Sequence, residues 1–331
     1  MTPAVETGML LGMKHIAAAL CACCLALLIL PALLGLAHPA PAWAQAASPR
    51  PLVLCSTTQI ADFAREVAGD HLDIRCVLAP GADPHTYSPT PADAALAARA
   101  ALCLQNGLHL EGSNWMAALA RDAGKPVVTC AKAVVPLQMD YDGHAMPDPH
   151  AWFSPANAAA YVRTIRDAFL QLDPANAPAY AARADLYLQQ LSVLDGWIRQ
   201  QVARIAPAQR ILVTSHDAFN YFCREYGFNP QHNYLSLAPV GWSTGGEVGG
   251  GMTPSRRAQV VASLKQSGAR AVFVETSVNP KLLREIADEA GVAIGGSLYS
   301  DSMGEAGTAG ERYLGMMREN VLTIVRALKG E

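Results

Sequence analysis

Short apolar runs alternate with longer helical patterns along most of this chain. Strands that alternate with helices of 10–15 residues are typical of βαβ units and parallel sheets. Helix starts are marked by a capping residue followed by Pro, at Thr90-Pro91, Ser154-Pro155, Asp173-Pro174, Thr253-Pro254 and Asn279-Pro280. The pattern predicts strands at Pro51–Ser56, Leu72–Ala79, Ala101–Gln105, Pro126–Cys130, Arg210–Ser215, His232–Leu237, Ala271–Glu275 and Val292–Leu298.

The middle of the chain has a different pattern, because no strand signal is found between Ser154 and Ala206. A helical pattern of about 30 residues follows Asp173-Pro174, and it would span roughly 45 Å at 1.5 Å per residue before Pro207 stops it. The sequence therefore predicts two α/β lobes, residues 45–172 and 207–331, each with a mostly parallel sheet flanked by helices and joined by one long rigid helix, residues 173–206. The apolar positions at helical spacing are Tyr180, Leu186, Leu191, Leu194, Trp197, Ile198, Val202 and Ile205.

The first 44 residues have the pattern of a secretory signal peptide. Lys14 and His15 precede the apolar stretch Ile16–Leu36, and Ala42-Trp43-Ala44 is an A-x-A cleavage site. A retained anchor is the alternative, but Pro39 and the other helix breakers before the small-residue site favour cleavage. A lipid anchor is not expected, because the faint lipidation motif ending at Cys21 lies too close to Lys14. We expect a periplasmic protein.

Composition narrows the classes of function. The chain is 51% hydrophobic and 16% charged, which excludes intrinsic disorder. After the leader, no apolar run approaches the 18 or more residues of a spanning helix. The formal net charge is −3, and no Lys/Arg cluster provides a nucleic-acid footprint.

The cysteines leave two interpretations open. Export would place the chain in an oxidising compartment. Cys55, Cys76, Cys103 and Cys130 each lie in a predicted strand, and Cys223 makes the number odd, so at least one is unpaired. The four are either small buried hydrophobic residues or include a cross-strand disulfide such as Cys55–Cys76.

Three histidines and one aspartate stand where strands give way to helices. The tripeptide Asp-Pro-His occurs twice and ends at His85 and His150, His216 follows a predicted strand, and Asp301 follows the last one. Side chains at the carboxyl ends of strands line the ligand crevice of open α/β sheets. Two ligands from each lobe make a closed N/O set that suits Zn²⁺ and, with a bidentate carboxylate, Mn²⁺ or Fe²⁺.

Each residue also has a simpler interpretation. A lone loop histidine is usually a surface or capping residue, and Asp217 or Asp301 could be a helix N-cap. The duplicated tripeptide and the shared position after strands favour a metal site for the set as a whole. His71 and His232 are expected on the surface, and His144 in a solvated acidic loop, Met139–Pro149.

The motifs resemble the ZnuA/TroA-like family of metal-binding solute-binding proteins, which serve ABC transporters for zinc, manganese or iron. The similarity extends over essentially the whole chain after the leader and is greatest to TroA-like members. It implies the two-lobed fold of class III periplasmic binding proteins, with a metal bound by His85, His150, His216 and Asp301. The matching stretches are Pro80–His85, Asn106–Glu111, Asp148–Phe153, Thr214–Phe219, Val274–Ser277 and Tyr299–Gly304.

The resemblance implies a monomer that captures a divalent metal and delivers it to a membrane ABC permease. Imidazole at His216, where manganese members tend to carry Glu, favours Zn²⁺ over Mn²⁺, with Fe²⁺ less favoured. Dedicated zinc members have a long His-rich acidic loop. This chain lacks it, and that difference favours Mn²⁺ over Zn²⁺. Zn²⁺ is therefore the favoured ligand and Mn²⁺ the second candidate.

Two other functions are weighed against this one. Gly241-Trp242-Ser243-Thr244-Gly245 matches the G-x-S-x-G of serine hydrolases, but glycines follow it instead of a helix, and no histidine comes after Ser243. A zinc hydrolase would need an open coordination position, and four protein ligands leave none. Some relatives are labelled surface adhesins, but no residues of this sequence indicate a binding surface for a host molecule. We predict a protein that is not an enzyme.

Overall fold

The computed structural model describes residues 50–330 except 142–143, 234–235 and 239–252. The helices are α2 Thr58–Ala68, α3 Pro91–Arg99, α4 Trp115–Asp122, α5 Pro155–Leu172, α6 Ala177–Val202, α7 Asn220–Tyr226, α8 Pro254–Gln266, α9 Lys281–Ala290 and α10 Tyr313–Lys329. The strands are β1 Leu52–Cys55, β2 Asp73–Cys76, β3 Leu102–Gln105, β4 Val127–Thr129, β5 Gln138–Tyr141, β6 His144–Pro147, β7 Ala271–Glu275 and β8 Ala293–Leu298. The predicted leader and the motif Gly241–Gly245 lie outside the described residues.

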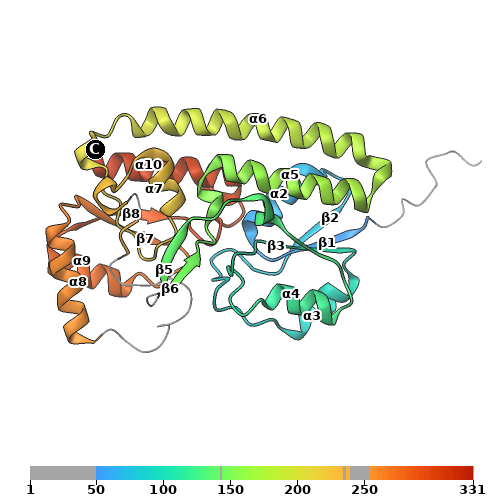
Figure 1. Ribbon diagram of the computed structural model, residues 1–331, viewed down its shortest axis with the longest axis horizontal. Coiled ribbons are helices and arrows are strands. Elements are labelled where there is room, and N and C mark those ends of the chain that lie inside the picture. The colour runs from blue at the N-terminus through green and yellow to red at the C-terminus, as the bar shows by residue number, and fades with distance from the viewer. Residues whose placement is uncertain (1–49, 142–143, 234–235, 239–252, 331) are drawn as a thin grey trace, which may run out of the picture. The chain divides into compact units, whose positions relative to one another are not determined.

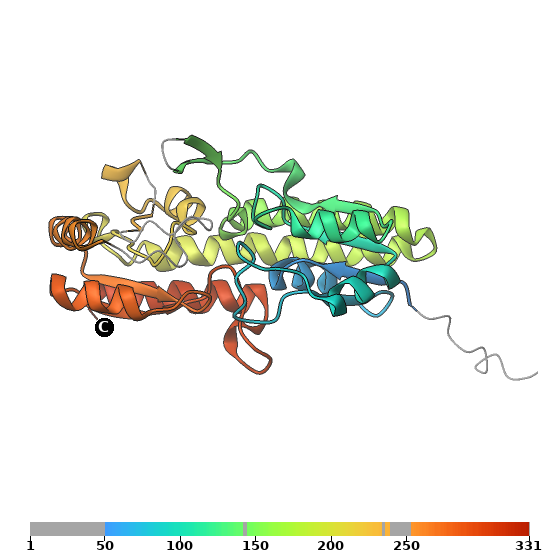
Figure 2. The same cartoon turned by 90° about the horizontal axis from the view of Figure 1, so that it is seen from below.

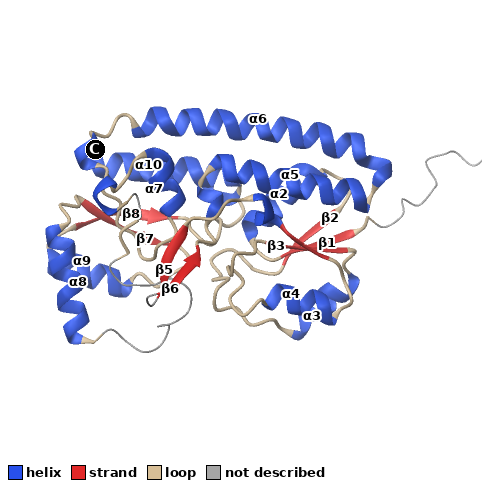
Figure 3. Cartoon of the chain, viewed as in Figure 1, coloured by secondary structure: helices blue, strands red, loops and turns tan. Residues whose placement is uncertain are grey.

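The N-terminal sheet has four parallel strands in the order β2-β1-β3-β4. Successive side chains of a strand point to opposite faces, so β1 places Val53 and Cys55 against α2 and Leu52 and Leu54 against α3 and α4. Helices cover both faces (Figure 3). This double cover explains why the strands have continuous apolar sequences.

The C-terminal sheet contains the parallel pair β7–β8, extended by single bridges from Thr214 to Phe273 and from Val213 to Leu237. The predicted strands at 210–215 and 232–237 are thus reduced to bridges among the described residues. One reason is that the side chain of Asn229 both accepts from the Leu212 N–H and donates to the Leu212 carbonyl, at 2.9 and 3.0 Å. The Leu212 N–H is therefore satisfied by a side chain, whereas its carbonyl also accepts from the N–H of Leu237 at 3.1 Å.

The long helix α6 has 26 residues and spans about 39 Å. It contacts α2 and α5 beside the first sheet and α7 and α10 beside the second (Figure 1). It begins at Ala177, since residues 174–176 form a short 3-10 turn. One expectation was wrong: Leu186, assigned to the apolar stripe, is 57% exposed. The structure thus confirms two parallel-sheet lobes flanked by helices and joined by a long helix.

Residues 139–149, expected to form a loop, instead contain most of an antiparallel hairpin, β5–β6. Met139 pairs with Met146 and is buried. Figure 2 shows this hairpin in green, extending away from the sheets. Among the helices that the structure describes, none is both long and apolar enough to span a membrane.

Candidate metal centre

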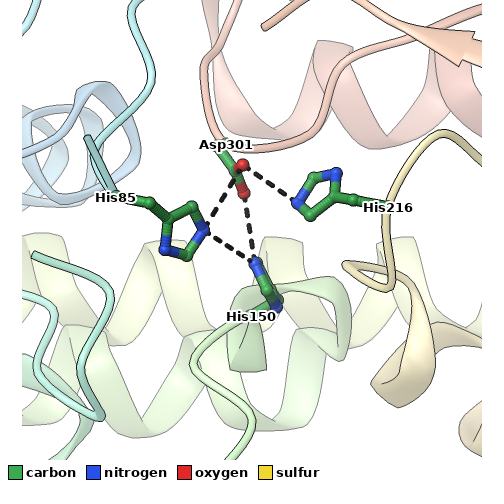
Figure 4. A group of neighbouring side chains, drawn as sticks. All are labelled: His85, His150, His216 and Asp301. Carbon is green, nitrogen blue, oxygen red and sulfur yellow. Dashed lines mark hydrogen bonds and ion pairs between the residues drawn. The ribbon is translucent and has the colours of Figure 1, made fainter. Parts of the chain in front are cut away.

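Four segments that are distant in the sequence bring the candidate ligands together. His85 lies in the turn between β2 and α3, and His150 directly precedes the 3-10 turn Ala151–Phe153. His216 follows the bridge at Thr214, and Asp301 follows β8. Figure 4 shows the three imidazoles and the carboxylate pointing towards one another. All four sequence-predicted residues therefore meet at one point.

The separations between ligand atoms are those of a compact set. The carboxylate of Asp301 lies 3.6 Å from Nε2 of His85, 3.4 Å from Nε2 of His150 and 3.0 Å from Nε2 of His216. The Nε2 atoms of His85 and His150 are 3.3 Å apart. One ligand atom from each residue lies within 4.8 Å of all the others, so the group could hold one metal ion.

The group is shielded from solvent. Side-chain exposure is 5% at His85, 0% at His150, 3% at His216 and 2% at Asp301. Buried polar atoms without partners are costly. Three imidazoles around a buried carboxylate are therefore a set that a cation could occupy.

Two of the imidazoles have a carboxylate behind them. Asp148 Oδ1 lies 2.8 Å from Nδ1 of His150 and accepts from its backbone N–H at 2.9 Å. Glu275 Oε2 lies 2.5 Å from Nδ1 of His216, and Oε1 accepts from the His216 backbone N–H at 2.9 Å. Such partners fix ring orientation and leave Nε2 free for a metal. Asn220 in turn donates to the other oxygen of Asp148 at 2.9 Å.

His85 is held differently. Asp83 accepts from its backbone N–H at 2.8 Å and from the hydroxyl of Thr86 at 2.9 Å, as a turn-forming carboxylate does. Its buried Nδ1 has no hydrogen-bond partner within the described part of the chain. The two copies of Asp-Pro-His are therefore not equivalent, because only the second supports its own imidazole.

The pKa shifts also distinguish His85 from His150 and His216. Burial lowers the pKa of His85 to about 4, and the charge of Asp301 compensates only in part. Burial would also lower the pKa of His150 and His216, but the carboxylates outweigh it. Asp148 and Asp301 raise the pKa of His150, and Glu275 and Asp301 raise that of His216 well above its usual value. The pKa of Asp301 is lowered, since the imidazoles outweigh its burial.

The segment that carries Asp301 is bonded to the first lobe. The side chain of Gln59 donates to the carbonyl of Ser300 at 2.9 Å, and the N–H of Met303 donates to the hydroxyl of Thr58 at 2.9 Å. Both Thr58 and Gln59 lie in the first turn of α2. Asp301 is therefore connected by sequence to β8 and by hydrogen bonds to α2.

Sequence reasoning missed the carboxylates behind the ligands. Glu275 ends a fully buried strand, and a buried carboxylate at that position is the signal that could have identified it. Asp148 stands in the second Asp-Pro-His but was given no role. Asp217, considered as a helix cap, is not the N-cap of α7, and its Oδ1 has no partner among the described residues. The four remaining described histidines are all exposed: His71, His109, His144 and His232.

This combination defines a class of protein. A closed, buried set of three imidazoles and one carboxylate holds a divalent metal without offering an obvious position for a reacting water. Two α/β lobes on one long helix supply that set from loops between their elements. These features are typical of a protein that holds a divalent metal between two lobes.

Comparison with known proteins identifies the family. Residues 53–327 match the family described as ZnuA, the periplasmic component A of a zinc-uptake complex. The zinc-binding protein TroA of Treponema pallidum is 33% identical over 93% of this chain and 98% of its own length. The manganese-binding lipoprotein MntA of Bacillus subtilis is 37% identical over 84% of this chain and 89% of its own. The chain belongs to this family of solute-binding proteins, which are not enzymes.

Solved structures of known proteins support the same family assignment. The periplasmic zinc-binding protein TroA of Treponema pallidum superimposes with a TM-score of 0.75 at 30% identity, covering 84% of this chain and 99% of that one. The manganese-bound periplasmic metal-binding protein of Candidatus Liberibacter asiaticus gives a TM-score of 0.70 at 26% identity, covering 84% and 100%. The protein is a divalent-metal-binding component of an ABC transporter.

Proposed function

We propose that this protein captures Zn²⁺ with Nε2 of His85, His150 and His216 and the carboxylate of Asp301, and delivers it to an ABC permease for import. We place it in the periplasm, exported by a cleaved signal peptide over residues 1–44. Residues 45–172 and 207–331 are the two lobes, and residues 173–206 are the connection between them. The protein works as a monomer with respect to metal capture.

One observation carries the proposal: four potential ligand atoms from four separate segments converge within 4.8 Å of one another in a buried position. Carboxylates behind His150 and His216 orient both rings with Nε2 towards the centre. Orientation of this kind is typical of histidines that bind metal.

The spacing supports zinc as the cargo. Tetrahedral zinc with bonds of 2.0–2.1 Å separates neighbouring ligand atoms by about 3.3 Å. Four separations within the set, three of them measured to one or the other oxygen of Asp301, lie between 3.0 and 3.6 Å and bracket that value, and the set as a whole lies within 4.8 Å. Imidazole is also the softer ligand and favours Zn²⁺ over Mn²⁺.

Manganese is the second candidate. Both oxygens of Asp301 face the set, Oδ2 towards His85 and His216 and Oδ1 towards His150. A bidentate carboxylate would raise the coordination number towards what Mn²⁺ accepts. The relatives named above include a zinc-binding protein and a manganese-binding lipoprotein, so similarity does not select the metal.

Calorimetric titration of metal-free exported protein with Zn²⁺ and Mn²⁺ tests the proposal. We expect one ion per chain and tighter binding of Zn²⁺. His216→Ala removes one ligand and should lower affinity by more than the roughly 10–100-fold that loss of an outer partner costs. His144→Ala removes an exposed histidine on β6 and should bind like the wild type. Equal affinity in both variants would contradict the ligand assignment, and tighter Mn²⁺ binding would reverse the choice of metal.

A further inference from the structure

Two cysteines that are not among the candidate ligands occupy paired positions on neighbouring strands. Cys55 ends β1 and Cys76 ends β2, and the parallel register places them opposite each other. Paired residues of parallel strands point to the same face of the sheet, and neighbouring strands are about 4.8 Å apart. Disulfides join Cα atoms that are roughly 4.4–6.8 Å apart. Both thiols are free in the structure, but the register places their Cα atoms at a separation that a disulfide can bridge.

The position of β2 makes a bond between them feasible. In the order β2-β1-β3-β4, β2 is an edge strand with no neighbour on its outer side among the described residues. Closure of the bond would therefore move an edge strand and not an interior one. Cys76 is half-buried and its thiol lies 3.8 Å from the carbonyl of Ser56, so it already points towards the end of β1.

The other cysteines are less suitable partners for Cys55. Cys103 is registered with Leu54 and therefore faces the opposite side of the sheet, among the residues packed on α3 and α4. Cys130 shares the apolar cluster of Cys55, but it lies in a 3-10 turn and not on a paired strand. In the part of the chain that the structure describes, no group of cysteines has the spacing of a metal site.

We propose that Cys55 and Cys76 form a disulfide in the exported protein. This disulfide is a property separate from metal binding. Of the proposed function, it depends only on export to an oxidising compartment. The oxidant is a disulfide-bearing thiol exchanger. One cysteine thiolate attacks its sulfur and releases one thiol, and the second cysteine then attacks the mixed disulfide and releases the other. Two protein thiols lose two protons and two electrons, and the oxidant's disulfide becomes two thiols.

Burial determines when this exchange takes place. Burial raises the pKa of the Cys76 thiol to about 12 and that of Cys55 well above its usual value. The thiolate is the attacking species, so exchange is slow once the sheet has formed. The bond therefore closes during folding and is then shielded from reductants.

The bond would reinforce one unit of the metal centre. Cys55 and Cys76 enclose α2, whose first turn holds the Asp301 segment through Thr58 and Gln59. A covalent link between β1 and β2 limits the unfolded conformations of this loop. The expected consequence is a more stable β1–α2–β2 unit.

Refolding followed by differential alkylation tests the proposal. Exported protein is reduced, denatured and refolded in a mixture of reduced and oxidised glutathione, and free thiols are then blocked before peptide mapping by mass spectrometry. We expect the peptides of Cys55 and Cys76 to be joined until reduction, while Cys103, Cys130 and Cys223 are alkylated. Alkylation of all five, or a Cys55–Cys130 pair, would overturn the proposal. A Zn²⁺ titration of the same sample reports separately on the proposed function.

Thermal unfolding supplies a second readout. Reduction should lower the Tm of the refolded wild type by about 5 °C or more. The double variant Cys55→Ala, Cys76→Ala should show no such shift, whereas the control Cys103→Ala should retain it. An equal shift in the double variant would overturn the assignment even if alkylation were incomplete.

Discussion

At the scale of single residues, the same tripeptide has two different uses. In Asp148-Pro149-His150 the carboxylate contacts both the backbone N–H and the ring of its histidine. In the first copy Asp83 contacts the backbone N–H of His85 and the hydroxyl of Thr86. Sequence could therefore predict both histidines as ligands, but not which of them is supported. That difference depends on where each loop directs its side chains.

The two aspartates provide a matched pair of variants. Asp148→Asn keeps the size of the side chain but removes the charge that orients His150, so Zn²⁺ affinity should fall about 10–100-fold. Asp83→Asn makes the same chemical change away from the ring and should have a much smaller effect. Calorimetry on both variants, with circular dichroism to verify folding, measures the difference. Similar losses would show that Asp148 acts only through the turn.

Proton release should accompany metal binding. The raised pKa values of His150 and His216 mean that these rings keep protons above the usual pKa of histidine, near 6.5. The metal must displace those protons, so affinity should rise with pH until both rings are neutral, whereas His85 is already neutral. At pH 6.5, titrations in buffers of different ionisation enthalpy should report more than one proton released per Zn²⁺.

The variant Glu275→Gln provides the control for this pH dependence. It removes the charge that raises the pKa of His216, so fewer protons should be released than in the wild type. Binding without any proton release in the wild type would contradict the electrostatic account.

At the scale of elements, the sequence predicted most strands and the helix starts, because buried parallel strands and capping pairs have strong local signals. The hairpin β5–β6 was missed, since its residues had been assigned to a solvated loop. The joining of the Asp301 segment to α2 could not have been predicted. Its contacts, such as Thr58 with Met303, connect residues 245 positions apart.

That contact gives a testable prediction. Thr58→Val preserves shape but leaves the buried N–H of Met303 without an acceptor, at a cost of about 1–3 kcal/mol. The control Thr57→Val removes the N-cap of α2, which costs about 0.5–2 kcal/mol without touching the Asp301 segment. Urea unfolding should show comparable losses, while only Thr58→Val should weaken Zn²⁺ binding. Equal affinities would show that the Asp301 segment is held by other contacts.

At the scale of the whole described chain, one apolar cluster continues from the first lobe through α6 to the second. It includes Phe63 of α2, Leu191 of α6 and Ile324 of α10. Such a core resists large rotations of one sheet against the other, so we expect metal binding to cause only a modest closure. The candidate site stands where loops of both lobes meet, and this juxtaposition makes its four ligands a single set.

The anomalous scattering of crystals grown with Zn²⁺, recorded on both sides of the zinc absorption edge, tests the central claim most directly. The account predicts one strong peak per chain, about 2.0–2.2 Å from the Nε2 atoms of His85, His150 and His216 and from the carboxylate of Asp301. A peak that lacks any of these four contacts, or a fully metal-loaded protein with no peak among them, would contradict it.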